Sequence, residues 1–279
     1  MNLGDYNDLE VARFVDFGLY LSSDDGDLLL PNKYVPEGTQ LGDVVHVFVY
    51  RDSEDRLIAT TLKPLARVNE LAALTVRDVS EHGAFLDWGL EKDLFLPHRN
   101  QRNNVRPGQR LTVYVYLDET SDRIVASARW ENFLQPDKPF EGKPGDAVQL
   151  FVAQETDLGY TAVVNGQYLG LLYYNEVFRP LRLGDTPTGY VRQVRPDGKI
   201  DLRLQKPGYE EAVDAADTLL NALRAAPNQR LPLSDKSEPD DIYRRLGMSK
   251  KVFKKALGSL YKQGLVELSP EHTQLVDKP

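Results

Sequence analysis

The chain has 279 residues, of which 41% are apolar and 27% charged, and its formal net charge is −8. This length allows for about two to four small domains, and no apolar run approaches the roughly 18 to 20 residues of a membrane-spanning helix, which excludes a membrane protein. The absence of cysteine excludes disulfides and thiolate chemistry. Because an acidic chain does not attract polyanions as a whole, nucleic-acid binding would need local basic patches.

Four short motifs recur in the same order about 66 residues further along the chain. The first copy contains 18-GLYL-21, 28-LLLP-31, 41-LGD-43 and 56-RLIATT-61, and the second contains 83-GAFL-86, 94-LFLP-97, 107-PGQ-109 and 123-RIVASA-128. A fainter third copy contains Gly159, 169-LGLL-172, 183-LGD-185 and 199-KIDLRL-204. The repeats predict three structural units built on one plan.

Each unit is predicted to be a small barrel of five strands. In the second unit, the segments rich in β-favouring residues are 74–80, 83–88, 93–97, 111–118 and 123–129. The polar stretch 98–109 is typical of a long connection between the third and fourth strands. Five short strands with one long connection indicate an OB-fold, a partly open Greek-key barrel.

The C-terminal segment changes from strand to helix periodicity. Apolar residues recur at spacings of three and four in 210–226, and two shorter helices are predicted over 240–247 and 249–264. The apolar members of the first helix are Val213, Ala216, Leu219, Leu220 and Leu223. Gly247 closes the second helix, Ser249 caps the third, and the runs 265–268 and 274–276 form a hairpin. Three helices and a hairpin predict a winged helix.

The third predicted helix separates its apolar and basic residues. At about 100° per residue, Phe253, Ala256, Leu257 and Leu260 share one side, and the lysines cover an arc of about 140° on the other, with Gly258 inside it. With two arginines just upstream, the basic patch comprises Arg244, Arg245, Lys250, Lys251, Lys254, Lys255 and Lys262. Such a patch is typical of a nucleic-acid contact and also of an ordinary solvated helix, so both interpretations stay open.

Several motifs resemble a known RNA-binding OB domain, which we call the S-one domain. They are V-x-x-x-G-A-F-L at Val79 to Leu86, 93-DLFLP-97, 105-VRPGQ-109, 123-RIVASAR-129 and, in the first unit, 14-FVDFGLYL-21. Together with the order of the units and the C-terminal segment, nearly the whole chain resembles the conserved virulence factor B family of bacterial RNA-binding regulators. The resemblance implies three S-one-like barrels followed by a winged helix.

The resemblance also implies which residues would contact RNA. An S-one barrel exposes its second strand, where unpaired bases stack on rings, with polar and basic help from the end of strand four and the start of strand five. The matching positions are Phe17, Tyr20, Asp52 and Arg56 in the first unit and His82, Phe85, Glu119 and Arg123 in the second. Four further candidates lie near the second face: Trp88, Phe95, His98 and Arg99.

The third unit departs from this pattern. Thr161 occupies the strand-two position and Lys199 replaces the arginine, while its rings stand elsewhere, at Tyr160, Tyr168, Tyr173 and Tyr174. We therefore do not expect it to bind in the same way. For the first two units, an alternative remains that the rings fill the cores and that Arg56 and Arg123 pair with Asp52 and Glu119.

No catalytic motif is found. The four histidines are scattered, and the chain has neither a phosphate-binding loop nor a nucleophile elbow, so we predict a non-enzymatic protein with no metal or cofactor. The N-terminal MNLGDYNDLE does not resemble a secretory signal, so a cytoplasmic location is expected.

The predicted fold is multidomain and mainly β, with barrels at residues 1–66, 67–140 and 141–207 and a winged helix at 208–279. The leading hypothesis is a monomeric, post-transcriptional RNA-binding regulator that binds single-stranded or loop RNA through several weak contacts. A DNA-binding transcription regulator led by the winged helix and a protein-interaction scaffold with non-binding barrels are the alternatives.

Overall fold

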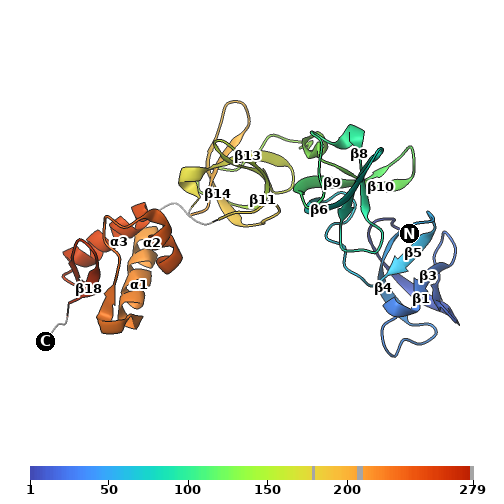
Figure 1. The fold of residues 1–279 in the computed structure, drawn as a ribbon, viewed down its shortest axis with the longest axis horizontal. Coiled ribbons are helices and arrows are strands. Elements are labelled where there is room, and N and C mark those ends of the chain that lie inside the picture. The colour runs from blue at the N-terminus through green and yellow to red at the C-terminus, as the bar shows by residue number, and fades with distance from the viewer. Residues whose placement is uncertain (178–179, 206–209, 277–279) are drawn as a thin grey trace. The chain divides into compact units, whose positions relative to one another are not determined.

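The computed structural model describes residues 1–177, 180–205 and 210–276, with only the backbone of residues 210–214 (Figure 1). The chain forms two compact units, Met1–Leu134 and Gln135–Pro279. The first unit holds two β-barrels, and the second holds a third barrel and a domain of helices with a small sheet. This architecture confirms the predicted fold class.

The two barrels of the first unit are each built from five short strands. The first barrel contains β1 (Tyr6–Val15), β2 (Gly18–Leu21), β3 (Leu28–Pro31), β4 (Val44–Arg51) and β5 (Leu57–Thr60). The second contains β6 (Leu71–Ser80), β7 (Gly83–Asp87), β8 (Leu94–Pro97), β9 (Arg110–Asp118) and β10 (Arg123–Ser127). In both barrels the third strand pairs in parallel with the fifth, and the fourth pairs back to the first and closes the barrel.

The third barrel repeats this strand order. It contains β11 (Ala147–Thr156), β12 (Gly159–Val164), β13 (Tyr168–Tyr173), β14 (Thr188–Val194) and β15 (Ile200–Arg203), and β14 pairs back to β11. In all three barrels the first strand carries a register shift at the same place, between Val11 and Arg13, Val76 and Asp78, and Val152 and Gln154. Such bulges bend a strand and help a small sheet to close. The faint third repeat in the sequence therefore does mark a third copy of the fold.

A glycine begins the second strand of every barrel because the neighbouring backbone leaves no room for a side chain. A Cβ on Gly18, Gly83 or Gly159 would lie 2.3, 2.4 or 2.2 Å from the carbonyl oxygen of the third strand. Those oxygens belong to Leu30, Leu96 and Leu172. Contacts this short are sterically forbidden, and they explain why each repeat has glycine at this point.

Residues of both barrels of the first unit join in one hydrophobic cluster at their junction, while most of the first barrel's core forms a cluster of its own. Phe48, on β4 of the first barrel, is fully buried and belongs to the core cluster of the second. Its ring meets the edge of Trp88 with centroids 5.9 Å apart and lies 5.6 Å from the ring of Tyr6. Burial also raises the pKa of Tyr50, two residues further along β4, to about 12. The two barrels are therefore packed as one body.

The C-terminal domain contains the three predicted helices. They are α1 (Glu210–Ala225), α2 (Pro239–Leu246) and α3 (Lys250–Lys262). Gly247 closes α2 in the left-handed conformation with φ of 66°, and the Ser249 hydroxyl accepts a hydrogen bond from the Val252 N–H at the start of α3. Both predicted caps are thus confirmed, and the fully buried Leu219 and Phe253 join α1 to α3.

The small sheet of this domain has one strand more than the sequence predicted. β17 (Val266–Leu268) and β18 (Thr273–Leu275) form the expected hairpin, and β16 (Arg230–Leu231) pairs with β18 on its other side. Because β16 has only two residues, it has no alternation pattern from which the sequence could have predicted it. The boundary predicted between residues 207 and 208 lies outside the described residues, as does the side chain of Val213, and the four domain ranges stay predictions.

Candidate nucleic-acid interface

Exposed aromatic rings lie on the outer face of the first barrel. Phe17 is 58% exposed just before β2, and Phe14 is 51% exposed on β1. Tyr20, on β2, is half-buried, and the guanidinium carbon of Arg13 lies 4.2 Å from its ring centroid. Arg13 also forms an ion pair with Asp27. Phe17 can therefore offer a base an open ring, whereas Arg13 covers one face of Tyr20.

The second barrel carries a pair of rings on the corresponding face. Phe85 on β7 and Phe95 on β8 lie opposite each other in register, with centroids 5.4 Å apart. Their neighbours along the two strands, such as Ala84 and Leu96, are fully buried, whereas both rings are half-buried. Core and outer-face residues therefore alternate along these strands.

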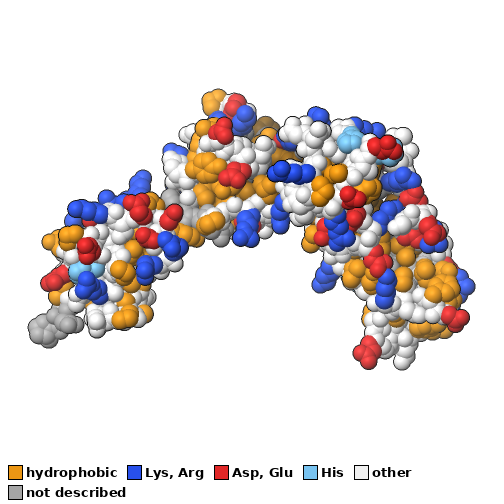
Figure 2. Space-filling view, viewed as in Figure 1, with side chains coloured by type: hydrophobic (Ala, Val, Ile, Leu, Met, Phe, Trp, Pro, Cys, Tyr) orange, Lys and Arg blue, Asp and Glu red, His pale blue; other side chains and the backbone are white. Residues whose placement is uncertain are grey.

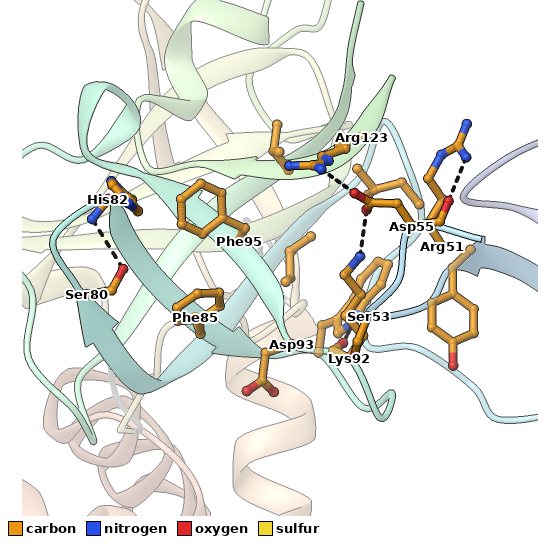
Figure 3. Close-up of a pocket in the computed structure, with 15 residues that line it drawn as sticks. Arg51, Ser53, Asp55, Ser80, His82, Phe85, Lys92, Asp93, Phe95 and Arg123 are labelled. Carbon is orange, nitrogen blue, oxygen red and sulfur yellow. Dashed lines mark hydrogen bonds and ion pairs between the residues drawn. The ribbon is translucent and has the colours of Figure 1, made fainter. Parts of the chain in front are cut away.

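A pocket of about 470 Å³ opens beside these rings, and five of the predicted residues line it (Figure 3). These five are His82, Phe85, Trp88, Phe95 and Arg123. Figure 3 shows His82 on one side of the two rings and Asp55, from the first barrel, on the other. His98 and Arg99 are exposed in the short helix η2 (His98–Asn100) that follows β8, and they do not line the pocket.

Trp88 is a correction to the predicted site. Its side chain borders the pocket but is only 3% exposed, and its indole N–H donates to the carbonyl oxygen of Lys92 at 2.7 Å. The ring packs against Phe48 across the junction of the two barrels. A ring so deeply buried cannot stack on a base, so Trp88 belongs to the shared core.

The arginines predicted on the barrel faces all have carboxylate partners. Arg56 pairs with Asp52 at 2.7 Å and with Glu54 at 2.9 Å, as the alternative interpretation anticipated for Asp52. Arg99 pairs with Asp118 at 3.1 Å. Figure 2 accordingly shows acidic and basic side chains interspersed over the visible face of the first unit. The charges of the barrel faces are therefore largely balanced.

Arg123 has a partner other than the expected one. Its guanidinium pairs with Asp55, in the β4–β5 turn of the first barrel, and not with Glu119. Asp55 also accepts a hydrogen bond from the Lys92 ammonium at 3.2 Å. The hydrogen bond from Lys92, against a smaller opposing effect of burial and with further help from Arg123, holds the pKa of Asp55 below its usual range. The carboxylate is therefore ionised at neutral pH and connects the two barrels.

The Asp52 carboxylate has a similar environment within the first barrel. Burial opposes its ionisation, but hydrogen bonds from the side chain and backbone of Arg56 and from the backbone of Glu54 outweigh burial and lower its pKa. The predicted pair of Asp52 and Arg56 is thus formed, and it fixes the β4–β5 turn. The same contacts leave Arg56 less free to bind a phosphate.

Most of the described rings named for the third barrel pack within it, although Tyr174 is 44% exposed. Tyr160 is 9% exposed and meets the ring of Tyr174 edge-on, and the Tyr174 hydroxyl donates to Glu155 at 2.9 Å. Tyr168 packs against Phe140, and the Tyr173 hydroxyl accepts a hydrogen bond from Arg195. Leu158, 63% exposed, stands just before the strand glycine, where the other barrels have Phe17 and His82. This barrel offers no comparable ring platform on its second strand.

The winged helix presents cations for which the described residues show no carboxylate partner. On α3, Lys251, Lys254, Lys255 and Lys262 are exposed and Lys250 is partly exposed, while Phe253 and Leu257 are buried. Among the described residues, no ion pair involves Arg245 or any of these lysines, whereas Arg244 pairs with Asp241. A Cβ on Gly258 would meet no atom within 4 Å, so the surface inside the lysine arc is open. The basic face predicted for this helix is present.

Sequence reasoning missed three residues at these surfaces. Tyr261 is 57% exposed on α3, and about 100° per residue places it within the lysine arc, between Lys250 and Lys254. A helical projection of the sequence would have revealed it. Asp55 and Lys92 meet only because the two barrels pack together, and no local pattern could have indicated their contact.

The described residues contain no group of three or more His, Asp or Glu side chains arranged to hold a metal ion. None of their helices is long and apolar enough to span a membrane.

Matches to two family models agree with this architecture. A model described as "S1 domain" matches residues 3–62 and 70–129, which lie in the first unit, and a model described as "CvfB-like winged helix domain" matches residues 217–275. The fold and these matches define a multidomain protein whose S1 and winged-helix domains support nucleic-acid binding.

Similarity to individual proteins extends along nearly the whole chain. The uncharacterized protein YitL of Bacillus subtilis is 32% identical, over 95% of this chain and 91% of its own length. Conserved virulence factor B of Staphylococcus epidermidis is 23% identical, over 86% of this chain and 82% of its own. The chain belongs to the conserved virulence factor B family. This chain also aligns with the crystal structure of a multidomain protein with nucleic acid binding domains from Streptococcus pneumoniae. The alignment covers 98% of each of the two chains, with 24% sequence identity and a TM-score of 0.45.

Proposed function

We propose that this protein binds unpaired RNA, with the first two barrels stacking bases and the winged helix contacting phosphates. The observation that carries the proposal is the presence of rings on the outer face of each of these barrels, an exposed ring at Phe17 and a half-buried pair at Phe85 and Phe95. Every nucleobase has a flat face, so rings of this kind bind unpaired strands with little dependence on sequence, whereas a duplex hides those faces.

The distribution of charge supports a division of labour between the two kinds of domain. The barrel arginines Arg56, Arg99 and Arg123 already pair with carboxylates, so each would have to give up a partner to bind a phosphate. No ion pair within the described residues holds the lysines of α3. Because several weak contacts on one chain reinforce one another, the two surfaces together can bind one RNA more tightly than either alone.

A titration with labelled oligouridylate, followed by fluorescence anisotropy, tests the stacking surface. We expect the intact protein to bind this unpaired strand more tightly than a fully paired RNA hairpin. Replacement of Phe17 and Phe85 by alanine removes about 1–3 kcal/mol per stacked base. Leu41→Ala, which removes an exposed apolar side chain from the loop before β4, serves as the control and leaves affinity unchanged.

The lysine surface is tested by the salt dependence of the same titration. Each phosphate contact on a single strand contributes about −0.7 to the slope of log K against log salt, so replacing Lys251, Lys254 and Lys255 by alanine reduces the slope by up to about 2. Replacement of three exposed lysines elsewhere, Lys63, Lys138 and Lys143, is the control for net charge. Equal slopes in the two variants would show that α3 does not contact the strand.

Two outcomes favour the alternative functions. If a duplex DNA competes better than oligouridylate and the lysine variant abolishes that binding, the winged helix acts on DNA. If no nucleic acid binds and a protein partner does so regardless of the ring substitutions, the barrels form an interaction scaffold. We propose further that RNA binding serves post-transcriptional regulation. In that case deletion of the gene changes the half-lives of bound transcripts, and the wild-type chain restores them but the ring variant does not.

A further inference from the structure

The pocket on the second barrel is a composite of both barrels. The turn between β4 and β5 of the first barrel contributes Ser53 and Asp55 to its lining, and β4 contributes Tyr50 and Arg51. The second barrel contributes Phe85, Phe95 and Trp88 and most of the apolar lining. Neither barrel has this site by itself. Its volume of about 470 Å³ lies within the range of about 300–1,000 Å³ that holds small ligands in proteins.

The lining divides into an apolar part and a charged rim. Phe85, Phe95, Leu94, Ile124 and Val125 form the apolar part, against which the flat face of a base can pack. At the end nearer the first barrel, Figure 3 shows Arg123 and Lys92 turned toward Asp55. A flat apolar surface beside two cations suits a nucleotide, which joins a base to a phosphate.

The two cations of the rim, Lys92 and Arg123, already bind acceptor groups of the first barrel. Lys92 donates to the Asp52 carbonyl oxygen at 2.6 Å as well as to Asp55, and Arg123 pairs with the same Asp55 carboxylate. A phosphate that reaches Arg123 must therefore take the place of Asp55 as its partner. The turn of the first barrel thus sets the charge of the binding face of the second.

We propose that this pocket binds one nucleotide of an unpaired RNA strand, with the base on Phe85 and Phe95 and the phosphate exchanging with Asp55 on Arg123 and Lys92. The inference rests on the proposed RNA-binding function and adds to it a specific subsite and a competing carboxylate. Because that carboxylate repels the phosphate it competes with, Asp55 lowers the affinity of the site.

The test compares Asp55→Asn with Glu91→Gln in the oligouridylate titration. Glu91 pairs with Lys33 across the same junction of the two barrels but does not line the pocket, so its substitution removes an equal charge and an equivalent inter-barrel contact. We expect Asp55→Asn to tighten binding by about threefold to tenfold and to steepen its salt dependence. Glu91→Gln leaves both unchanged, and Phe85→Ala weakens binding about tenfold.

Three outcomes overturn the inference. Asp55→Asn could bind RNA no better than Glu91→Gln, which would make Asp55 a structural contact alone. Phe85→Ala and Asp55→Asn could both leave the affinity for RNA unchanged while Phe17→Ala or the α3 lysine variant lowers it. In that case the proposed function stands and the subsite is wrong. If the wild-type protein does not bind RNA at all, the proposed function itself is refuted.

A second measurement locates the strand in the Asp55→Asn variant. Substitution could loosen the two barrels and expose a new surface, and affinity would then rise for another reason. Photo-crosslinking of oligouridylate that carries 4-thiouridine, followed by peptide mapping, distinguishes the two cases. We expect crosslinks in the β7–β8 hairpin, and crosslinks that move elsewhere in the variant overturn the inference.

Discussion

Replacement of Phe48 by alanine is expected to lower the free energy of unfolding of both barrels of the first unit together. Phe48 belongs to β4 of the first barrel, yet its fully buried ring packs in the core of the second, against Trp88. Truncation of a fully buried phenylalanine costs about 3–5 kcal/mol. With a urea dependence of about 2 kcal/mol per M for a unit of this size, the midpoint of unfolding falls by about 1.5–2.5 M.

The chain has a built-in probe for this experiment. It has two tryptophans, Trp88 and Trp130, and both lie in the second barrel. Tryptophan fluorescence therefore follows the unfolding of the second barrel while the substitution is made in the first. The control is Phe14→Ala, at a site 51% exposed, which is expected to change the free energy of unfolding by less than about 0.5 kcal/mol.

The reasoning is refuted if the tryptophan transition of Phe48→Ala keeps the wild-type midpoint. That result would mean that the second barrel keeps its stability when the shared core is cut, and that the barrels unfold independently. A second refuting outcome is two separate transitions in the wild-type protein, because a shared core predicts one cooperative transition for the unit.

Two further predictions concern single residues in the barrels. Gly18→Ala brings a Cβ to within 2.3 Å of the Leu30 carbonyl oxygen and is expected to destabilise the first unit by about 1–3 kcal/mol. The same urea titration measures this loss, and an unchanged midpoint would contradict the close approach. Asp201, 4% exposed, is opposed in its ionisation by burial, but hydrogen bonds from Arg195 and Gln193 outweigh burial and lower its pKa. Its stabilising contribution is therefore present at neutral pH and is lost as the pH falls through the lowered folded-state pKa. Asp201→Asn should therefore reduce hydrogen-exchange protection of β14 and β15 by about 1–3 kcal/mol at neutral pH and by less in acid, and a pH-independent difference would contradict this assignment.

The repeated barrels were predictable because each strand carries its own local pattern. Alternation of apolar and outward residues, as in Ala84, Phe85 and Leu86, depends on geometry within a strand, and the glycine at each second strand depends on a contact to the next strand. The winged-helix caps at Gly247 and Ser249 are likewise set by residues close in sequence. Such local constraints are visible in a single sequence.

The errors at the candidate site arise where two barrels meet. Trp88 is buried because Phe48, forty positions earlier in the sequence, packs against it, and Arg123 turns to Asp55 although Glu119 stands nearer in the chain. Neither contact follows from periodicity or spacing within one barrel. The sequence therefore located Phe17, Phe85 and Phe95 on outer faces but could not distinguish them from a ring at a domain junction.

The shared core of the first two barrels has an evolutionary consequence. A substitution at Phe48 or Trp88 changes the stability of both barrels, so selection constrains the sequences of the two barrels together. Most of the first barrel's core forms a separate cluster, so this constraint acts at the junction, and the described core cluster of the third barrel contains no residue of the first unit. This agrees with the sequence, in which Thr161 and Leu158 stand where the other two barrels have rings and a histidine.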